Sequence, residues 1–170
     1  MSNADPIHES AEPLEHPRGI YTARVDAKGR LKLPAAFVKY LSSHKHKDFF
    51  VTSTNKRSFY IYTLPQWKRV EEVIDNPDNP EEYKMFKATR HTAGKYGADA
   101  TVDSEGRMLI PQLLREDLQV HDKPVWLEYV KGSIEVYGED VYQERERESD
   151  LMTLAKSDEA LALKMRKLTQ

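Results

Sequence analysis

Four basic side chains follow one another closely near the start of the chain, and their chemistry suits an anionic partner. They are Arg24, Lys28, Arg30 and Lys32, which lie at even spacing. Because side chains at even spacing along a strand share one face, we expect these four to point the same way if strand geometry continues through the intervening turn. Arginine can contact guanine O6 and N7 together, so a ribbon that carries these residues would suit a DNA major groove.

The positive charge of the chain is concentrated around these residues. The 170-residue chain has 26 basic and 28 acidic residues, and this net charge of −2 is not typical of a nucleic-acid binder. Residues 18–57, however, hold ten basic and two acidic residues, a net charge of +8, whereas residues 95–134 hold five and seven, a net charge of −2. The first window is therefore the predicted anion-binding part.

These two windows belong to an internal repeat with a constant offset of 77 residues. Residues 23–34 (ARVDAKGRLKLP) recur as residues 100–111 (ATVDSEGRMLIP), and six of the twelve paired positions are identical. Each copy continues with a short helix-like run, at residues 35–42 and 112–118, and then with strand-like segments. Two copies of one unit predict a pseudo-symmetric pair.

Each copy carries the pattern Asp-x-x-Gly-Arg within a strand-like alternation, which predicts a tight reversal of the chain. Gly29 and Gly106 can take the positive φ that such a turn requires, and Asp26 and Asp103 can accept hydrogen bonds from the turn backbone. The aspartate and arginine of each copy could form a structural salt bridge that holds the turn, or the arginine could read DNA. Their spacing leaves both interpretations open.

The chain divides into five expected segments. They are a flexible arm at 1–17, a first repeat at 18–74, a linker loop and helix at 75–96, a second repeat at 97–145 and a helical tail at 146–170. In the linker, the run Asn79-Pro80-Glu81-Glu82 is typical of a helix start.

The tail is expected to be one charged helix from Tyr142 onward. Its apolar residues keep heptad spacing, interrupted by Asp158; they are Leu151, Leu154, Leu161, Met165 and Leu168. Since fewer than three heptads are present, a coiled coil and a helix laid against its own domain stay equally open.

Several motifs in this order resemble the MraZ family of bacterial transcription regulators, over roughly residues 18–150. They are Asp-x-Lys-Gly-Arg-Leu-x-Leu-Pro, Leu64-Pro65-Gln66-Trp67, Asp-x-x-Gly-Arg-Met-Leu-Ile-Pro and Ile134-Glu135-Val136-Tyr137. A single Asp-x-x-x-Arg copy would indicate only the wider AbrB-like swapped-hairpin superfamily. The resemblance implies an α+β fold in which tandem AbrB-like swapped-hairpin β units form one pseudo-two-fold, double-ψ-like barrel core with peripheral helices.

The resemblance also implies a function. It implies a sequence-specific regulator of the division and cell-wall gene cluster that reads short G-rich direct repeats in double-stranded promoter DNA as a ring-like homo-oligomer. The motif of the family that reads DNA falls on Asp26, Lys28 and Arg30 and on Asp103 and Arg107 of this chain. Including the basic ribbon and the start of the fold, the expected DNA-binding residues are Arg18, Arg24, Asp26, Lys28, Arg30, Lys32, Asp103 and Arg107.

Two positions depart from the family pattern. Glu105 stands where the first copy has Lys28, so the second hairpin should repel phosphate more than the first. The first helix-like run reads Phe37-Val38-Lys39, where relatives usually carry one or two arginines.

Other classes of function find little support in the sequence. Without cysteine the chain has no disulfide, thiolate metal site or cysteine nucleophile, and its composition fits the reducing cytoplasm. The resemblance to the MraZ family further implies a nucleoid-associated protein. The six histidines are scattered, and motifs such as the P-loop are missing, so we expect no catalytic residue, metal, cofactor, small-molecule substrate or membrane span. The alternative is an antitoxin-like or other protein-binding swapped-hairpin module, with residues 143–170 available to a partner.

Overall fold

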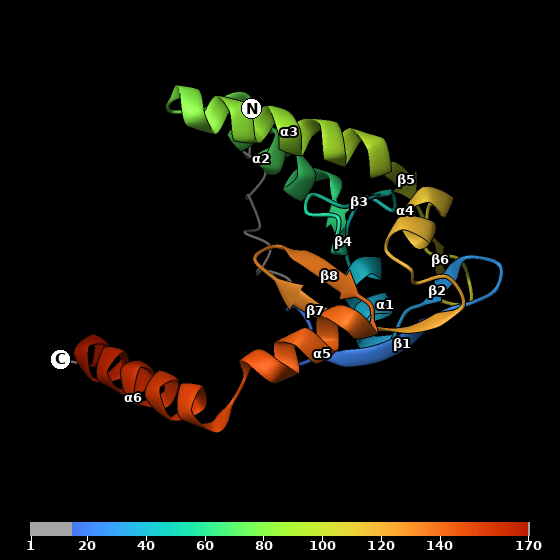
Figure 1. The fold of residues 1–170 in the computed structure, drawn as a ribbon. Coiled ribbons are helices and arrows are strands. Elements are labelled where there is room, and N and C mark those ends of the chain that lie inside the picture. Colours follow the sequence, from blue (N-terminus) through green and yellow to red (C-terminus); the bar gives the residue numbers. More distant parts are fainter. Residues whose placement is uncertain (1–14, 170) are drawn as a thin grey trace, which may run out of the picture.

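The computed structural model describes residues 15–169, and its centre is one antiparallel sheet of eight strands that curls into a nearly closed barrel (Figure 1). The strands are β1 (Tyr21–Val25), β2 (Arg30–Lys32), β3 (Phe49–Thr52), β4 (Ser58–Thr63), β5 (Ala98–Ala100), β6 (Arg107–Leu109), β7 (Lys123–Val130) and β8 (Ser133–Tyr137). They are arranged in the order β5-β3-β4-β8-β7-β1-β2-β6. An isolated antiparallel bridge joins Val102, just after β5, to Met108 on β6. It narrows the gap between these two edge strands of the sheet.

The two copies of the repeat exchange strands within this barrel. Strand β1 of the first copy pairs with β7 of the second, and β5 of the second copy pairs with β3 of the first. In the ladder between β2 and β6, Leu31 lies opposite Met108, its equivalent at an offset of 77. The pseudo-two-fold axis therefore passes through this pair, and the expected α+β fold of interleaved tandem units is confirmed.

The core of the barrel follows from the alternation of apolar residues in both copies. Val25, Leu31 and Leu33 are buried, as are Met108 and Ile110 at equivalent positions of the second copy. Burying one such side chain contributes on the order of 1.5–3 kcal/mol. The intervening polar residues of the same strands are consequently directed to the outer face of the barrel.

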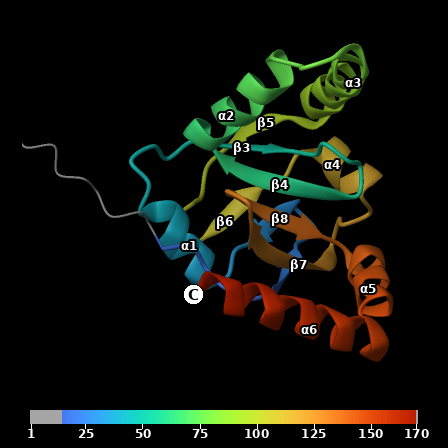
Figure 2. The ribbon, with the colours of Figure 1, turned by 90° about the vertical axis from the view of Figure 1, so that its left-hand side faces the viewer.

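Six helices lie outside the barrel within the described residues. They are α1 (Ala35–Ser42), α2 (Leu64–Asp75), α3 (Pro80–Tyr96), α4 (Gln112–Asp117), α5 (Glu139–Glu148) and α6 (Leu151–Leu168). Helix α3 begins as its sequence predicts, because the Asn79 side chain accepts a hydrogen bond from the Glu82 N–H. Figure 2 shows α2 and α3 at one end of the barrel, and α5 and α6 at the other.

An ion-pair cluster attaches α5 to the barrel. The buried Glu135 carboxylate on β8 accepts hydrogen bonds from Ser58, Tyr60 and Arg145, the last of these from α5. Burial opposes ionisation of Glu135, but the hydrogen bonds from Arg145 and Tyr60 outweigh it and lower the pKa of this carboxyl. Arg145 also donates to Glu128 on β7.

The expectation of one helix from Tyr142 onward is wrong. Helix α5 already begins at Glu139, where two acidic residues in the first turn suit a helix N-terminus, and it ends at Glu148. Asp150 then caps a second helix, α6, by accepting a hydrogen bond from the Thr153 N–H at 2.7 Å. Since every residue of α6 is exposed, this helix is not laid against its own domain.

The start of the chain is described only in part. Residues 1–14 of the expected arm lie outside the described residues, and at its end the His16 ring stacks on Tyr129 with 4.0 Å between centroids. Among residues 15–169, no helix combines the length and the apolar character needed to cross a membrane.

Candidate nucleic-acid interface

The reversal between β1 and β2, which we call turn one (residues 26–30), is held by the side chain of Asp26. Its Oδ1 accepts hydrogen bonds from the N–H groups of Lys28 and Arg30, both at 2.9 Å, and its Oδ2 accepts from Arg30 Nε at 3.0 Å. Gly29 has a φ of 82°, which lets the chain close the turn. The backbone N–H of Arg30 is the largest of the interactions that keep the pKa of Asp26 below its usual value.

The reversal between β5 and β6, which we call turn two (residues 103–107), repeats this arrangement. Asp103 Oδ1 accepts from the N–H groups of Glu105 and Arg107 at 2.9 Å, and Oδ2 accepts from Arg107 Nε at 3.1 Å. The pKa of Asp103 is lowered for the same reason, with the Arg107 N–H as the largest cause. The interpretation of the aspartate–arginine pair as a structural salt bridge is therefore confirmed in both copies.

The two turns are fixed relative to each other by exchanged backbone hydrogen bonds. The carbonyl of Gly29 accepts from the Ile110 N–H at 2.9 Å, and the carbonyl of Gly106 accepts from the Leu33 N–H at 3.0 Å. Each turn is thus bonded to the strand end of the other copy, so the barrel presents them as one unit.

The strand register brings basic residues of both copies into one row. Arg24 on β1 lies opposite Lys32 on β2, and Lys32 lies opposite Arg107 on β6. Since residues directly opposite each other in antiparallel strands share a face, these three side chains form a row across three strands, which we call the basic row. Arg30 is two residues before Lys32 and shares its face, as the even spacing predicts.

All three members of the basic row have acceptors within the molecule, and those of Arg24 and Lys32 lie outside the turn that carries Arg107 or on its backbone. Arg24 Nη2 donates to the Asp122 carbonyl at 2.7 Å and to Asp122 Oδ1 at 3.1 Å. Lys32 Nζ donates to the carbonyl of Glu105 in turn two. To reach phosphate, either of these two side chains would exchange these acceptors for phosphate oxygens.

The remaining candidate residues differ in position. Lys28 is exposed at the tip of turn one, and no salt bridge between described residues involves it. Arg18 precedes β1, at the end of that strand away from turn one, and lies 3.9 Å from Glu15. The structure does not bring Arg18 together with the other candidates. Lys39 is exposed on α1.

The two turns differ in how their arginines are paired. Arg107 Nη2 lies 2.7 Å from the carboxylate of Glu105, so both its Nε and one terminal nitrogen are engaged. Arg30 is engaged through Nε, and within residues 15–169 no hydrogen bond involves its terminal nitrogens. Only turn one therefore offers the free edge of a guanidinium that is already oriented.

Sequence reasoning missed Arg115 on α4, which lies directly against turn one. A Cβ atom on Gly29 would lie 2.4 Å from Arg115 Cζ. Arg115 Nε donates to the Ile110 carbonyl at 2.9 Å, and Nη1 lies 2.7 Å from Nδ1 of His121. The offset of 77 pairs Arg115 with Val38, but only the strand exchange places α4 beside the turn of the other copy.

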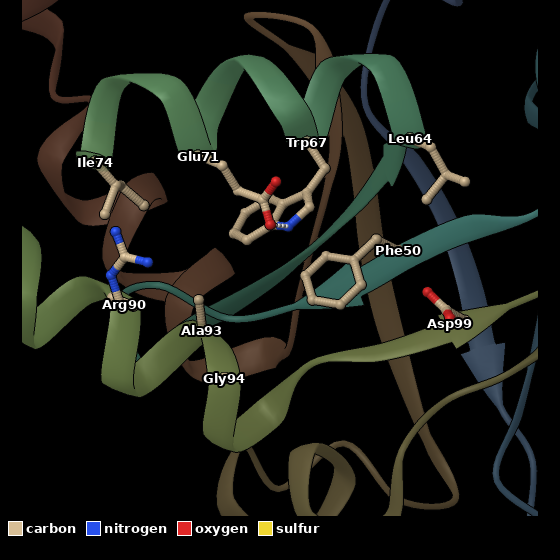
Figure 3. A pocket seen from close by; sticks show the side chains of 9 residues that line it. All are labelled: Phe50, Leu64, Trp67, Glu71, Ile74, Arg90, Ala93, Gly94 and Asp99. Atoms are coloured by element: carbon tan, nitrogen blue, oxygen red, sulfur yellow. Dashed lines mark hydrogen bonds between the residues drawn. The ribbon is translucent and has the colours of Figure 1, made fainter. Parts of the chain in front are cut away.

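A cavity of about 340 Å³ lies between α2, α3 and the strands β3 and β5 (Figure 3). Its apolar wall includes Phe50 and Trp67, whose ring centroids are 4.6 Å apart. The Trp67 indole N–H donates to Glu71 at 2.9 Å, and Arg90 pairs with Asp75. The cavity belongs to the α2–α3 layer and is separate from the basic row on β1, β2 and β6. No group of three potential metal ligands occurs among residues 15–169.

Comparisons with known proteins show which family this chain resembles. A family model described as "MraZ protein, putative antitoxin-like" matches residues 18–88. A transcriptional regulator MraZ from Acidobacterium capsulatum is 36% identical over 129 residues, which cover 75% of this chain and 79% of that relative. This chain belongs to the MraZ family of transcriptional regulators.

Two further MraZ relatives are similar to this chain over a comparable length. The transcriptional regulator MraZ of Koribacter versatilis is 32% identical over 124 residues, covering 71% of this chain and 75% of the relative. That of Caldanaerobacter subterraneus is 30% identical over 135 residues, covering 78% and 88%. Similarity to MraZ proteins thus extends over most of the chain.

Proposed function

We propose that this chain is a sequence-specific DNA-binding regulator that acts on the division and cell-wall gene cluster by reading G-rich direct repeats at its promoter. The observation that carries the proposal is the pattern of hydrogen bonds made by the Arg30 guanidinium. Its Nε is held by Asp26 at 3.0 Å, while its terminal nitrogens have no hydrogen-bond partner among residues 15–169. A guanidinium oriented in this way loses little further conformational freedom when it contacts guanine O6 and N7.

The residues around Arg30 have separate roles in this proposal. Arg30 reads base edges, and Asp26 orients it. Lys28 at the tip of turn one contacts phosphate, together with Arg24 and Lys32 of the basic row. In turn two, Asp103 orients Arg107, whose contact with DNA is weaker because Glu105 already pairs with it.

The regulator acts as a ring-like homo-oligomer on the nucleoid. One subunit presents a single turn one, whereas several copies around a ring engage successive repeats, which raises affinity by orders of magnitude without new contacts. The basic window at 18–57 and the acidic window at 95–134 favour a head-to-tail contact between neighbours, the type of contact that closes rings. Light scattering that shows a monomer at all concentrations and salts would rule out this assembly.

Fluorescence anisotropy tests the proposal on the source organism's own cluster-promoter DNA and on a scrambled duplex, across a salt series. Wild type should prefer the promoter. Arg30→Ala should cost about 1–3 kcal/mol per site and relax base preference, whereas Lys28→Ala should weaken binding to both duplexes alike and lower the salt slope by about 1. Equal affinity of wild type for promoter and scrambled DNA would leave Asp26–Arg30 a structural pair only.

A second candidate function is an antitoxin-like, protein-binding module. The observation that favours it is the description of the matched family model, which includes the term antitoxin-like. A small partner that co-purifies in stoichiometric amount, combined with a lack of promoter preference, would support this alternative over the DNA-binding regulator.

A further inference from the structure

Helix α6 carries an apolar stripe that has no partner within its own chain. In heptad positions a and d it has Leu151, Leu154, Asp158, Leu161, Met165 and Leu168. The five apolar residues among them are between 48% and 86% exposed. Figures 1 and 2 show α6 following α5 on the side of the barrel opposite α2 and α3. An isolated helix of this length is marginal in water, so its stability depends on covering this stripe.

We propose that the α6 helices of two copies of this chain pair side by side in antiparallel orientation, as a short two-stranded coiled coil. The charge of the helix indicates the partner and the orientation. Residues 150–159 contain three acidic residues and one basic residue, a net charge of −2, whereas residues 160–169 contain three basic residues and no acidic one. Antiparallel pairing places each acidic half beside a basic half, and parallel pairing places like charges together.

The one polar residue in the stripe supports the same orientation. In a parallel pair, the two Asp158 carboxylates would meet at the same layer of the apolar seam, where burying two like charges is costly. In an antiparallel pair, each Asp158 lies opposite Leu161 of the other copy and near Lys164, at the flanking position g. The antiparallel arrangement therefore gives the carboxylate a cation.

The rest of the helix is compatible with close approach. The flanking e positions are Ala155 and Ala162, whose small side chains allow two helices to pack closely. Leu163 lies on the opposite side of the helix from the stripe and is 56% exposed, similar to Leu161 at 59%. The helix thus provides a matched control, because these two leucines differ in position and hardly in exposure.

Because the chain contains no cysteine, engineered cysteines report the pairing without background. Full-length Leu154→Cys and Met165→Cys variants, carrying different tags, are mixed and treated with a short bismaleimide. In the antiparallel register Leu154 faces Met165, whereas the two copies of Leu154 lie roughly 16 Å apart, being eleven residues out of step. We expect cross-links mainly between the two variants.

Three results would overturn the proposal. Cross-links mainly between identical variants would mean parallel pairing, and the lack of any cross-link would mean that α6 does not pair with itself. Cross-linking of α6 to a stoichiometric amount of another protein, with no cross-link between the two variants, would mean that α6 has a different partner.

A second experiment separates pairing from folding. Leu161→Lys should reduce the cross-link yield about tenfold, since it buries a charge in the seam, and should lower the mass in light scattering. Leu163→Lys should change neither quantity. Equal effects of the two substitutions would contradict the proposed seam. The inference does not depend on DNA binding by turn one, so anisotropy on promoter DNA tests the proposed function separately.

Discussion

Turn one and turn two have the same backbone hydrogen bonds and opposite charges at their tips. In both, an aspartate accepts two backbone N–H groups and the Nε of the arginine. The second residue after the aspartate is Lys28 in turn one and Glu105 in turn two, and only Glu105 pairs with its arginine. The hydrogen bonds that build the turn are therefore separable from the charges that decide what it can bind.

The helix beside each turn adds to this difference. Arg115 lies against turn one, and Val38 is the nearest side chain at the equivalent place beside turn two. Turn one thus gains a second guanidinium, which lies beside Gly29, and turn two gains an apolar contact. One repeat unit has kept the structure of the turn while its two copies have acquired different surfaces.

The largest expected effect comes from giving turn one the charge of turn two. Lys28→Glu removes one positive charge, adds a negative one and offers Arg30 the pairing that Glu105 offers Arg107. Affinity for promoter DNA should fall roughly a hundredfold at low salt, and the salt slope should decrease by about 2. Anisotropy measures both. Lys84→Glu on α3 is the control for the same charge change away from the turns, and an equal loss in this variant would contradict the assignment.

Substitutions of the two turn glycines are expected to differ in how much they lower the free energy of unfolding. Gly29→Ala and Gly106→Ala should each cost about 1–2 kcal/mol of unfolding free energy, because both positions have positive φ. Gly29→Ala should cost about 1 kcal/mol more, since the new methyl displaces Arg115 from the Ile110 carbonyl. Denaturant unfolding of both variants checks this order. A larger loss for Gly106→Ala would mean that Arg115 does not support turn one.

The reverse exchange of charge, made in turn two, should raise the affinity for DNA by less than Lys28→Glu lowers it. Glu105→Lys frees Arg107 Nη2 and makes the tip of turn two basic, so affinity for DNA should rise by up to about tenfold, with a salt slope steeper by about 1. Glu81→Lys on α3 makes the same change of charge away from the turns and should have little effect. An unchanged affinity for Glu105→Lys would mean that turn two does not approach DNA.

The smallest expected difference is in pH dependence, because the same interactions act on both aspartates. Asp26 and Asp103 each have a pKa below the ordinary 3.8. A folded-state pKa below the unfolded value means that the ionised aspartate stabilises the fold. This contribution to the free energy of unfolding is complete above the unfolded pKa and is lost as the pH falls through the folded pKa. An NMR titration of the side-chain carboxyl carbons should show both groups titrating below 3.8. A value above this for either aspartate would indicate that its turn is not held as described.

Local features of the fold were predictable because short stretches of sequence encode them. The helix-like run at 35–42 coincides with α1, and the start of α3 follows from Asn79, whose side chain must accept a backbone N–H at that point. The tail was less predictable. The break between α5 and α6 depends on Asp150 as a cap and on Arg145 attaching α5 to Glu135, two residues whose polar character does not distinguish them from other charged positions.

Short stretches of the chain encode the repeat, the form of each turn and the unequal charge of the two copies, since a glycine with positive φ and an aspartate bonding to its own turn are local requirements. Which groups meet in space depends on the folded barrel. The basic row combines residues from both copies because β2 pairs with β6, and Arg115 reaches turn one because the copies exchange strands. These contacts join residues 75 to 86 positions apart, so they depend on the register of the whole barrel, which no short stretch of the chain encodes.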